Sequence, residues 1–306
     1  MGTIILFYKY IDIQYPHSIM KWQRTLCTSL GLKGRILLAT EGINGILGGE
    51  TDRIELYKQA MNAHAYFADI DFKESDGSAD CFPRLMVKVK KEIVKLGLDP
   101  QEVRARDAGI SLSPEEAHAL IEQNKDLVLL DTRNEYESRI GTFQNALVPN
   151  TTNFRDFPDY INKNLEQLQD KNVLMFCTGG IRCERASAYV KTKSIAKNVY
   201  HIRGGIHRYV EKFPNGYFKG KNYVFDGRIA VKVSDDVLAQ CEHCKMTCDE
   251  YTNCINAECN KQIIVCPSCM PSYHNTCSTR CLDLVTRGLV KVRVLPKRVN
   301  QQSCII

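Results

Sequence analysis

The densest chemical feature of the sequence is a block of cysteines toward its carboxyl end. Nine of the fourteen cysteines lie between Cys241 and Cys281, in a stretch with few large apolar side chains. Such a segment buries too little apolar surface to fold unaided, so it needs cross-links. In an intracellular protein, cysteines grouped in this way ligate metals more often than they form disulfides. The block therefore predicts a small metal-binding segment.

The cysteine spacing suits two tetrahedral metal sites. Cys241-x2-Cys244 and Cys266-x2-Cys269 have the spacing of zinc knuckles. The remaining candidate ligands are Cys254, Cys259, Cys277 and Cys281. Eight thiolates are enough for two structural zinc ions, although the spacing does not say which four share a site. An iron–sulfur cluster takes the same ligands and is the alternative; Cys248 is a ninth cysteine outside this count.

Length, hydropathy and charge limit the number of domains, the location and the partners that the sequence allows. A chain of 306 residues indicates two or three domains. It has no apolar run long enough to cross a membrane and no recognisable signal peptide, so we expect a cytoplasmic protein that does not contact membranes. The net charge of +6 does not identify a partner. The carboxyl-terminal tail is basic, with Arg287, Lys291, Arg293, Lys297 and Arg298. It is either a solvated tail or an arm that contacts phosphate.

Residues 1–95 are predicted to form a ferredoxin-like α+β domain. Apolar periodicity and turn residues give the order strand, helix, hairpin, helix, strand. The corresponding ranges are 4–13, 17–32, 34–50, 51–64 and 84–94. The order β-α-β-β-α-β is that of a split βαβ arrangement. A polar linker is expected at 96–110.

Residues 111–228 are predicted to form an α/β domain with a parallel sheet. Ser113 and Pro114 mark the start of its first helix. Buried strands, each ending in polar or glycine residues, are expected at 127–133, 172–177 and 198–205. A parallel sheet brings such strand ends together at its ligand-binding edge. The final part, 229–306, holds the cysteine block and the basic tail.

Cys177 lies between a predicted buried strand and a helix that begins near Cys183. The intervening loop is Thr178, Gly179, Gly180, Ile181 and Arg182. Its two glycines let backbone N–H groups point inward, and with the helix N-terminus and the arginine they favour negative charge at the loop centre. Cys177 is therefore predicted to have a lowered pKa and to act as a nucleophile. A Cys-x4-Arg loop is sized for a persulfide sulfur, whereas a phosphatase loop has one residue more.

These motifs resemble those of rhodanese domains. The run 131–137, Asp-Thr-Arg-Asn-Glu-Tyr-Glu, matches the D-x-R-x-x-x-E element, and Arg203-Gly204-Gly205 matches the glycine pair after the last core strand. Thr142 stands where rhodanese domains usually have a histidine. Three features together, the 177–184 loop, the run 34–45 and the late cysteines, resemble the tRNA uridine(34) hydroxylase family, long known as rhodanese-related sulfurtransferases.

The resemblance implies oxygen-dependent hydroxylation of the wobble uridine of tRNA to 5-hydroxyuridine, with O2 as co-substrate and the anticodon loop as partner. Cys177 would add to the uracil ring or carry an activated oxygen or sulfur species. Arg182 would stabilise its charge, and Cys183 would either resolve a Cys177 persulfide or serve as a small residue at the helix start. Asp131 and Arg133 are expected to pair and support the pocket. The sequence has no flavin or haem motif.

Two regions are candidates for RNA contact. Residues 200–228 interleave aromatic and basic side chains, which would either grip unpaired bases or pack the central domain onto its neighbours. Arg35 and Asn44 are a candidate second wall for the anticodon loop.

Two other functions remain open at the level of sequence. One is transfer of sulfane sulfur through a Cys177 persulfide, and the other is a non-catalytic, zinc-stabilised RNA-binding protein. The intact Cys177–Arg182 loop argues against a non-catalytic role. The additional domains favour the hydroxylase, because sulfur transfer needs only the rhodanese unit.

Overall fold

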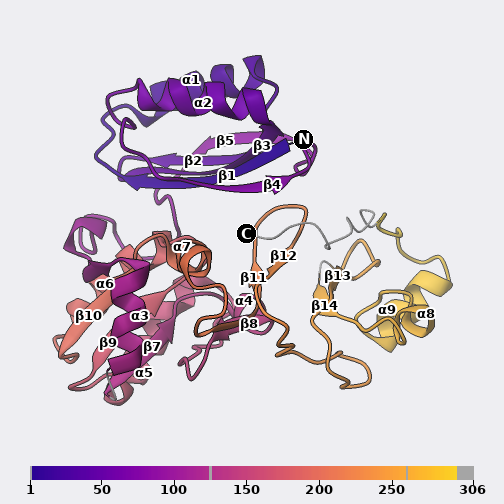
Figure 1. Ribbon diagram of the computed structural model, residues 1–306. Helices are drawn as coiled ribbons and strands as arrows, with labels where there is room; N and C mark the ends of the chain where they lie inside the picture. Colours follow the sequence, from indigo (N-terminus) through magenta and orange to yellow (C-terminus); the bar gives the residue numbers. More distant parts are fainter. Residues whose placement is uncertain (1, 124–125, 260, 295–306) are drawn as a thin grey trace.

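The computed structural model describes residues 2–123, 126–259 and 261–294. It has a sheet with two helices above a central α/β domain, and a smaller cysteine-rich part to one side (Figure 1). Within the described residues, no helix is both long and apolar enough to cross a membrane.

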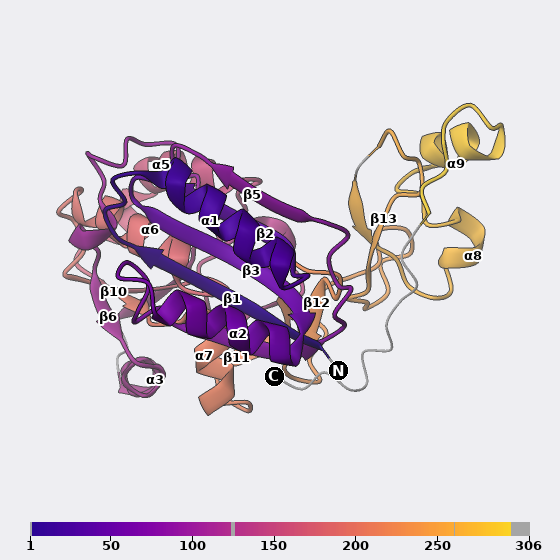
Figure 2. The ribbon, with the colours of Figure 1, turned by 90° about the horizontal axis from the view of Figure 1, so that it is seen from above.

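The amino-terminal domain is a five-stranded sheet with two helices on one face (Figure 2). Its elements are β1 (Gly2–Tyr10), α1 (Pro16–Ser29), β2 (Lys33–Ala39), β3 (Gly42–Glu50), α2 (Thr51–Asn62), β4 (Phe72–Gly77) and β5 (Leu85–Val89). The strand order is β4-β1-β3-β2-β5, and the first four follow the ferredoxin-like order. The helices bury side chains such as Ile54 and Tyr57 against the sheet, which leaves its other face toward the central domain.

One strand of this sheet was not expected. β4 pairs antiparallel with β1, whereas the predicted last strand, near β5, pairs parallel with β2 at the opposite edge. The sequence of β4, Phe-Lys-Glu-Ser-Asp-Gly, is mostly polar and poor in strand-forming residues. Its conformation is fixed by pairing with β1.

The central domain contains a four-stranded parallel sheet in the order β6-β10-β9-β7. Its elements are β6 (Ile110–Leu112), α3 (Pro114–Gln123), β7 (Leu127–Asp131), α4 (Glu135–Ser138), β8 (Gly141–Phe143), α5 (Phe157–Lys163), β9 (Asn172–Phe176), α6 (Ile181–Lys191), β10 (Asn198–Ile202) and α7 (Gly205–Lys212). Val173 to Phe176 are fully buried on both faces of the sheet, as a covered parallel strand requires. Ser113 caps α3 as predicted, because its Oγ accepts the Glu116 N–H at 3.2 Å.

The remaining elements join the central domain to the cysteine-rich part. β11 (Phe218–Tyr223) pairs with β8 and with β12 (Ala230–Lys232). Beyond it lie β13 (Tyr251–Asn253), β14 (Gln262–Ile264), α8 (Met270–Tyr273) and α9 (Thr279–Thr286). The segment 96–110 packs its apolar side chains, such as Leu96 and Val103, into the core of the central domain.

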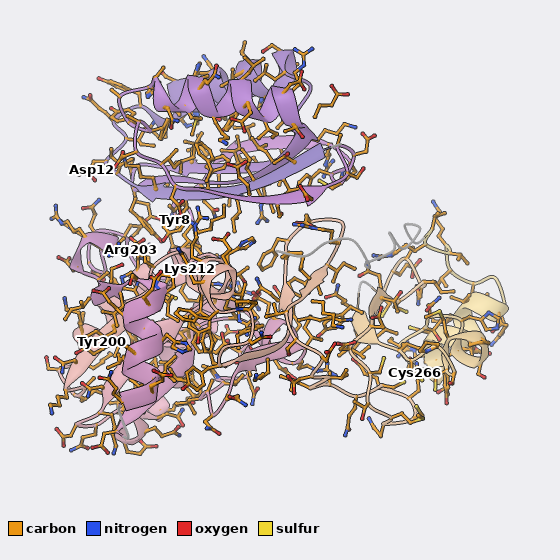
Figure 3. The ribbon with its side chains drawn as sticks, in the orientation of Figure 1. Tyr8, Asp12, Tyr200, Arg203, Lys212 and Cys266 are labelled. Carbon is orange, nitrogen blue, oxygen red and sulfur yellow. The ribbon has the colours of Figure 1, made fainter. Side chains whose placement is uncertain are left out.

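The open face of the amino-terminal sheet is held over the carboxyl ends of the parallel strands by specific contacts to α6. Tyr8 Oη donates to Glu184 Oε1 at 2.8 Å, and Tyr10 Oη donates to the Ile181 carbonyl at 3.1 Å. Figure 3 shows Tyr8 on the side of the sheet that faces the central domain. Arg185 is fully buried and forms an ion pair with Glu41 at 2.9 Å. Because breaking a buried pair is costly, this contact fixes the position of the upper domain.

Candidate active site

The Cys177 loop folds as a cradle around the cysteine sulfur. The Gly180 N–H donates to Cys177 Sγ at 3.1 Å. Gly180 has φ of 101°, a left-handed conformation that glycine adopts without strain, and α6 begins directly after it at Ile181, two residues before the expected position. The backbone N–H groups at this turn therefore point toward the sulfur, as anion-binding loops require.

The environment of Cys177 favours its thiolate although the residue is buried. Burial raises the pKa of Cys177, but a hydrogen bond from Cys183, the positive charge of Arg182 and the N–H groups of Arg182 and Gly180 outweigh this effect and lower the pKa to about 5. Burial raises the pKa of Cys183, and the hydrogen bond to Cys177 and the negative charge of that thiolate raise it further. One thiol of the pair is thus ionised near neutral pH and the other remains a proton donor.

Arg182 is held in place by a carboxylate whose role the sequence did not reveal. Its guanidinium makes two hydrogen bonds to Glu137, at 2.6 and 2.7 Å, and Thr178 Oγ1 donates to the same carboxylate at 3.2 Å. Glu137 is completely buried. A bidentate pair of this kind fixes the guanidinium in one orientation beside the loop. The sequence signal was the final glutamate of the D-x-R-x-x-x-E element.

Asp131 and Arg133 form the expected pair. Both are fully buried, and Arg133 Nη2 lies 2.7 Å from Asp131 Oδ2. Arg133 also donates to the Gly141 carbonyl at 2.6 Å, while Thr142 Oγ1 donates to Asp131 at 3.1 Å. The pair lies behind the site, since neither side chain lines the cavity described next.

Cys177 lies at a cavity of about 370 Å³ between the amino-terminal and central domains. The upper domain contributes Leu6, Tyr8, Arg35, Asn44 and Ile46. These residues alternate along three adjacent strands, so they share one face of the sheet. The lower wall consists of Asn134, Tyr136, Cys177, Thr178, Gly179, Ile181 and Arg182, and the remaining lining residues are Val94, Lys95, Asn153, Phe154, Arg155 and Phe225. Its volume is in the range typical of small-molecule sites.

The cavity is positively charged. Arg35, Lys95, Arg155 and Arg182 line it, and no acidic side chain of the described residues does so. Arg182 is neutralised by Glu137, but in the described part of the chain no ion pair engages the other three cations, which are exposed. The cavity therefore suits an anionic ligand.

A second titratable group lies behind the cavity wall. Tyr8 lines the cavity and donates a hydrogen bond to Glu184 in the first turn of α6. Burial raises the pKa of Glu184 to about 7, the negative charge of Cys177 adds to this effect, and the Tyr8 hydrogen bond and Lys73 oppose it. The site thus contains a carboxyl group that can exchange a proton near neutral pH.

The eight predicted metal ligands form two separate groups of four sulfur atoms. One group is Cys241, Cys244, Cys266 and Cys269, and the other is Cys254, Cys259, Cys277 and Cys281. Sγ–Sγ distances of 3.6 Å for Cys244–Cys266 and 3.5 Å for Cys259–Cys277 fit the separation of about 3.8 Å that tetrahedral zinc–sulfur bonds impose. Both donor sets therefore fit a four-coordinate metal, and Cys248 belongs to neither.

Three family models match successive parts of the chain. A UPF0176 acylphosphatase like domain matches residues 2–93, a rhodanese-like domain matches 113–212, and a rhodanase C-terminal model matches 219–282.

Curated relatives match nearly the whole chain. A Corynebacterium jeikeium protein named tRNA uridine(34) hydroxylase is 42% identical over 276 residues, 87% of this chain and 89% of its own. Proteins with the same name from Corynebacterium aurimucosum and Staphylococcus epidermidis are each 40% identical and cover 88% and 91% of this chain, and 92% and 88% of their own lengths. The chain belongs to the tRNA uridine(34) hydroxylase family.

In this member of the tRNA uridine(34) hydroxylase family, the aromatic and basic stretch 200–228 mainly packs domains together. Tyr209 and Phe218 are buried in the core of the rhodanese domain. Arg208 pairs with Asp71 of the upper domain, and Lys221 pairs with Asp249 of the cysteine-rich part at 2.9 Å. For these four side chains, burial and ion pairing favour the packing role over contact with RNA. Arg203 and Lys212, labelled in Figure 3, are exposed.

Two residues expected at an RNA-contacting wall lie at the cavity. Arg35 and Asn44 do line the same cavity as Cys177. Phe225, within the same stretch but not singled out from the sequence, also lines it. In the basic tail, Arg287 pairs with Asp283 at 3.3 Å, whereas Lys297 and Arg298 lie outside the described residues.

Proposed function

We propose that this chain hydroxylates C5 of the wobble uridine of tRNA, position 34, to give 5-hydroxyuridine, with O2 as the oxygen donor. The main support is the arrangement of a cysteine thiolate in a cationic cavity of about 370 Å³. The relatives' shared name supplies the substrate and the position. We expect the reaction to take place in the cytoplasm, with the anticodon loop bound at the cavity.

The proposed chemistry begins with addition of the Cys177 thiolate to C6 of uracil, which makes C5 nucleophilic. One oxygen atom of O2 becomes bonded to C5, and the other leaves as water when a dithiol reductant supplies two electrons and two protons and is itself oxidised to a disulfide. Loss of the C5 proton and departure of Cys177 restore the ring. The Gly180 N–H and Arg182 stabilise the thiolate as entering and leaving group. Tyr8 and Glu184 hold a proton at the cavity wall.

The other residues have supporting roles in this proposal. Cys183 keeps Cys177 ionised by donating a hydrogen bond, and it would resolve an oxidised or persulfidated Cys177 by forming a disulfide. Asp131 and Arg133 stiffen the chain behind the loop. The two four-cysteine groups hold zinc, which would supply folding free energy to the carboxyl-terminal part.

The direct test is nucleoside analysis of tRNA from cells that lack the protein and have no other route to 5-hydroxyuridine. Wild-type protein is expected to restore the modified base, Cys177→Ser to restore none, and Cys248→Ala, which removes a cysteine outside the loop and both metal groups, to restore it. Product formed under ¹⁸O₂ should contain the label. Restoration by Cys177→Ser, or label acquired from water instead, would contradict the proposal.

Sulfur transfer is the second candidate, supported by the Cys-x4-Arg loop and the N–H groups that cradle the cysteine sulfur. In that case Cys177 takes the sulfane sulfur of thiosulfate, releases sulfite, and passes the sulfur to cyanide or a protein thiol. Thiocyanate formation by the purified protein, together with unchanged tRNA in cells that lack it, would favour this function over hydroxylation.

A further inference from the structure

A second cavity adjoins the first and belongs to none of the roles assigned so far. Its volume is about 360 Å³. Its lining includes Arg35, Phe82, Arg84, Tyr223, Phe225 and Asp226. Arg35, Ile46 and Phe225 line both cavities. The two hollows are therefore neighbours separated by a shared wall.

The second cavity combines aromatic surface with positive charge. Phe82, Tyr223 and Phe225 supply rings, and the side chains of Arg35 and Arg84 are exposed. The acidic residue Asp226 is already engaged, because Arg228 donates to its two oxygens at 2.9 and 2.7 Å. The remaining charge is positive. Aromatic faces beside arginine are the usual means of holding an unpaired nucleotide.

Phe225 is placed as a stacking surface at the boundary. Its side chain is 40% exposed although it is large and apolar. Its ring centroid lies 5.8 Å from the Arg182 guanidinium, and the ring makes an edge contact with Tyr223 at 5.4 Å between centroids. These two neighbours hold the ring while part of its surface stays accessible. A base entering the second cavity would meet this ring.

Arg35 is placed where two successive nucleotides would be joined. It lies on β2 opposite Ile46 of β3, and the pair borders both cavities. Among the described acids, none forms an ion pair with it, so its guanidinium remains available. Adjacent nucleotides of a single strand share one phosphate, and arginine binds phosphate with two parallel hydrogen bonds.

We propose that the second cavity binds the nucleotide adjoining the target uridine, with its base against Phe225 and the linking phosphate on Arg35. This subsite rests on the proposed function, since it takes the same tRNA as its ligand. It would orient the uridine over Cys177 by holding its neighbour, so that the substrate is recognised as a dinucleotide step and not as a single base.

The test is binding of an anticodon stem-loop RNA to the full-length protein, measured as a double-mutant cycle. On the protein the change is Phe225→Leu, which keeps an apolar side chain and removes the ring. On the RNA the base of residue 33 or 35 is deleted to leave an abasic nucleotide. Each change alone should weaken binding about tenfold, the usual order for one stacked base. At one of the two RNA positions, the abasic RNA and the Phe225→Leu protein together should bind no more weakly than when only one of the two changes is present.

A parallel cycle examines the phosphate. Arg35→Gln is combined with a neutral methylphosphonate at the linkage between the target uridine and the same neighbour. Each change should lower affinity about tenfold, as expected for loss of a charged hydrogen bond, and the pair should again lower it no further, while Arg35→Lys should retain part of the affinity. Arg53→Gln on α2, across the sheet and away from both cavities, is the matched control and should bind as wild type does.

The subsite would be overturned if, in both cycles and at both RNA positions, the double change lowered the affinity by the product of the two single effects. Because the readout is binding, this outcome is separate from the fate of the proposed function. If the losses multiply while wild-type protein hydroxylates uridine 34, the subsite fails and the function stands. If the cycles show coupling while no 5-hydroxyuridine forms, the function fails and the subsite stands.

Discussion

At the residue scale, the central feature is a cysteine that is buried and yet ionised. Burial by itself keeps a thiol protonated, as it does for Cys27, whose pKa is raised to about 12. Cys177 is equally hidden, but the Cys183 thiol and the backbone N–H groups of Arg182 and Gly180 donate hydrogen bonds to it, and the positive charge of Arg182 also stabilises its thiolate. The difference between the two cysteines is therefore in their hydrogen-bond partners and not in exposure.

This contrast gives a prediction for thiol reactivity. Alkylation of Cys177, followed by peptide mass spectrometry, should accelerate as pH rises through about 5 and level off before neutrality, because only the thiolate reacts. Cys27 should remain unmodified in the folded protein. Cys183→Ala should move the Cys177 profile to higher pH by removing a donor, and Cys183→Ser, which retains one, should move it less. A profile for Cys177 that rises only above pH 8 would show that the loop does not stabilise the thiolate.

At the scale of elements, the cysteine loop is shaped by the turn that begins α7 as well as by its own residues. The N–H groups of Ile206 and His207 donate to the carbonyls of Cys177 and Thr178 at 2.9 and 3.1 Å. Gly205 has φ of 64°, and a Cβ added there would lie 2.3 Å from the Cys177 carbonyl oxygen. The glycine pair after β10 is thus required for close approach of two loops.

We therefore expect Gly205→Ala to lower the free energy of unfolding by more than the strain of a left-handed alanine accounts for, and to disturb the Cys177 loop. Gly31 offers a matched control, since its φ is 67° and no atom of the described residues lies within 4 Å of an added Cβ. Gly31→Ala should cost about 1 kcal/mol of unfolding free energy, the price of a left-handed alanine. Gly205→Ala should cost more and should also slow alkylation of Cys177. Equal losses in denaturant titrations, with unchanged Cys177 reactivity, would show that the close contact is unimportant.

At the scale of the whole molecule, three units have distinct tasks. The rhodanese domain supplies the cysteine loop, and the amino-terminal sheet supplies the opposite wall of the cavity. Ion pairs such as Arg185–Glu41 fix the position of one domain relative to the other. The carboxyl-terminal part is attached through Lys221, which contacts Asp249 and Glu250. No single unit encloses the cavity.

The two four-cysteine groups predict the metal content of the purified protein. Protein purified without chelators should contain two zinc ions per chain, one for each group of four cysteines. Cys244→Ser and Cys259→Ser should each lose one ion and loosen the carboxyl-terminal part, because structural zinc contributes folding free energy directly. Cys248→Ala should retain both ions. Elemental analysis checks the counts, and strong absorbance near 400 nm with bound iron would show an iron–sulfur cluster in place of zinc.

Local sequence determined the parts of this protein that depend on neighbours in the chain. The Cys177 loop, the Asp131–Arg133 pair, the cap of α3 and the alternation of strands and helices were all predictable, because spacing and turn chemistry fix them within a few residues. The eight cysteines that gather in two groups of four could be named for the same reason, although their division into the two groups could not.

Tertiary structure alone decided which distant residues meet. The polar strand β4 exists through its pairing with β1. Glu137 reaches Arg182, and Tyr8 reaches Glu184, across 45 and 176 residues of sequence. The basic and aromatic stretch after β10 proved to be mostly packing, and Arg35 and Phe225 came to border both cavities only because two domains face each other. Periodicity shows which side of an element is buried, but the partner against which it is buried is set by the packing of the whole chain.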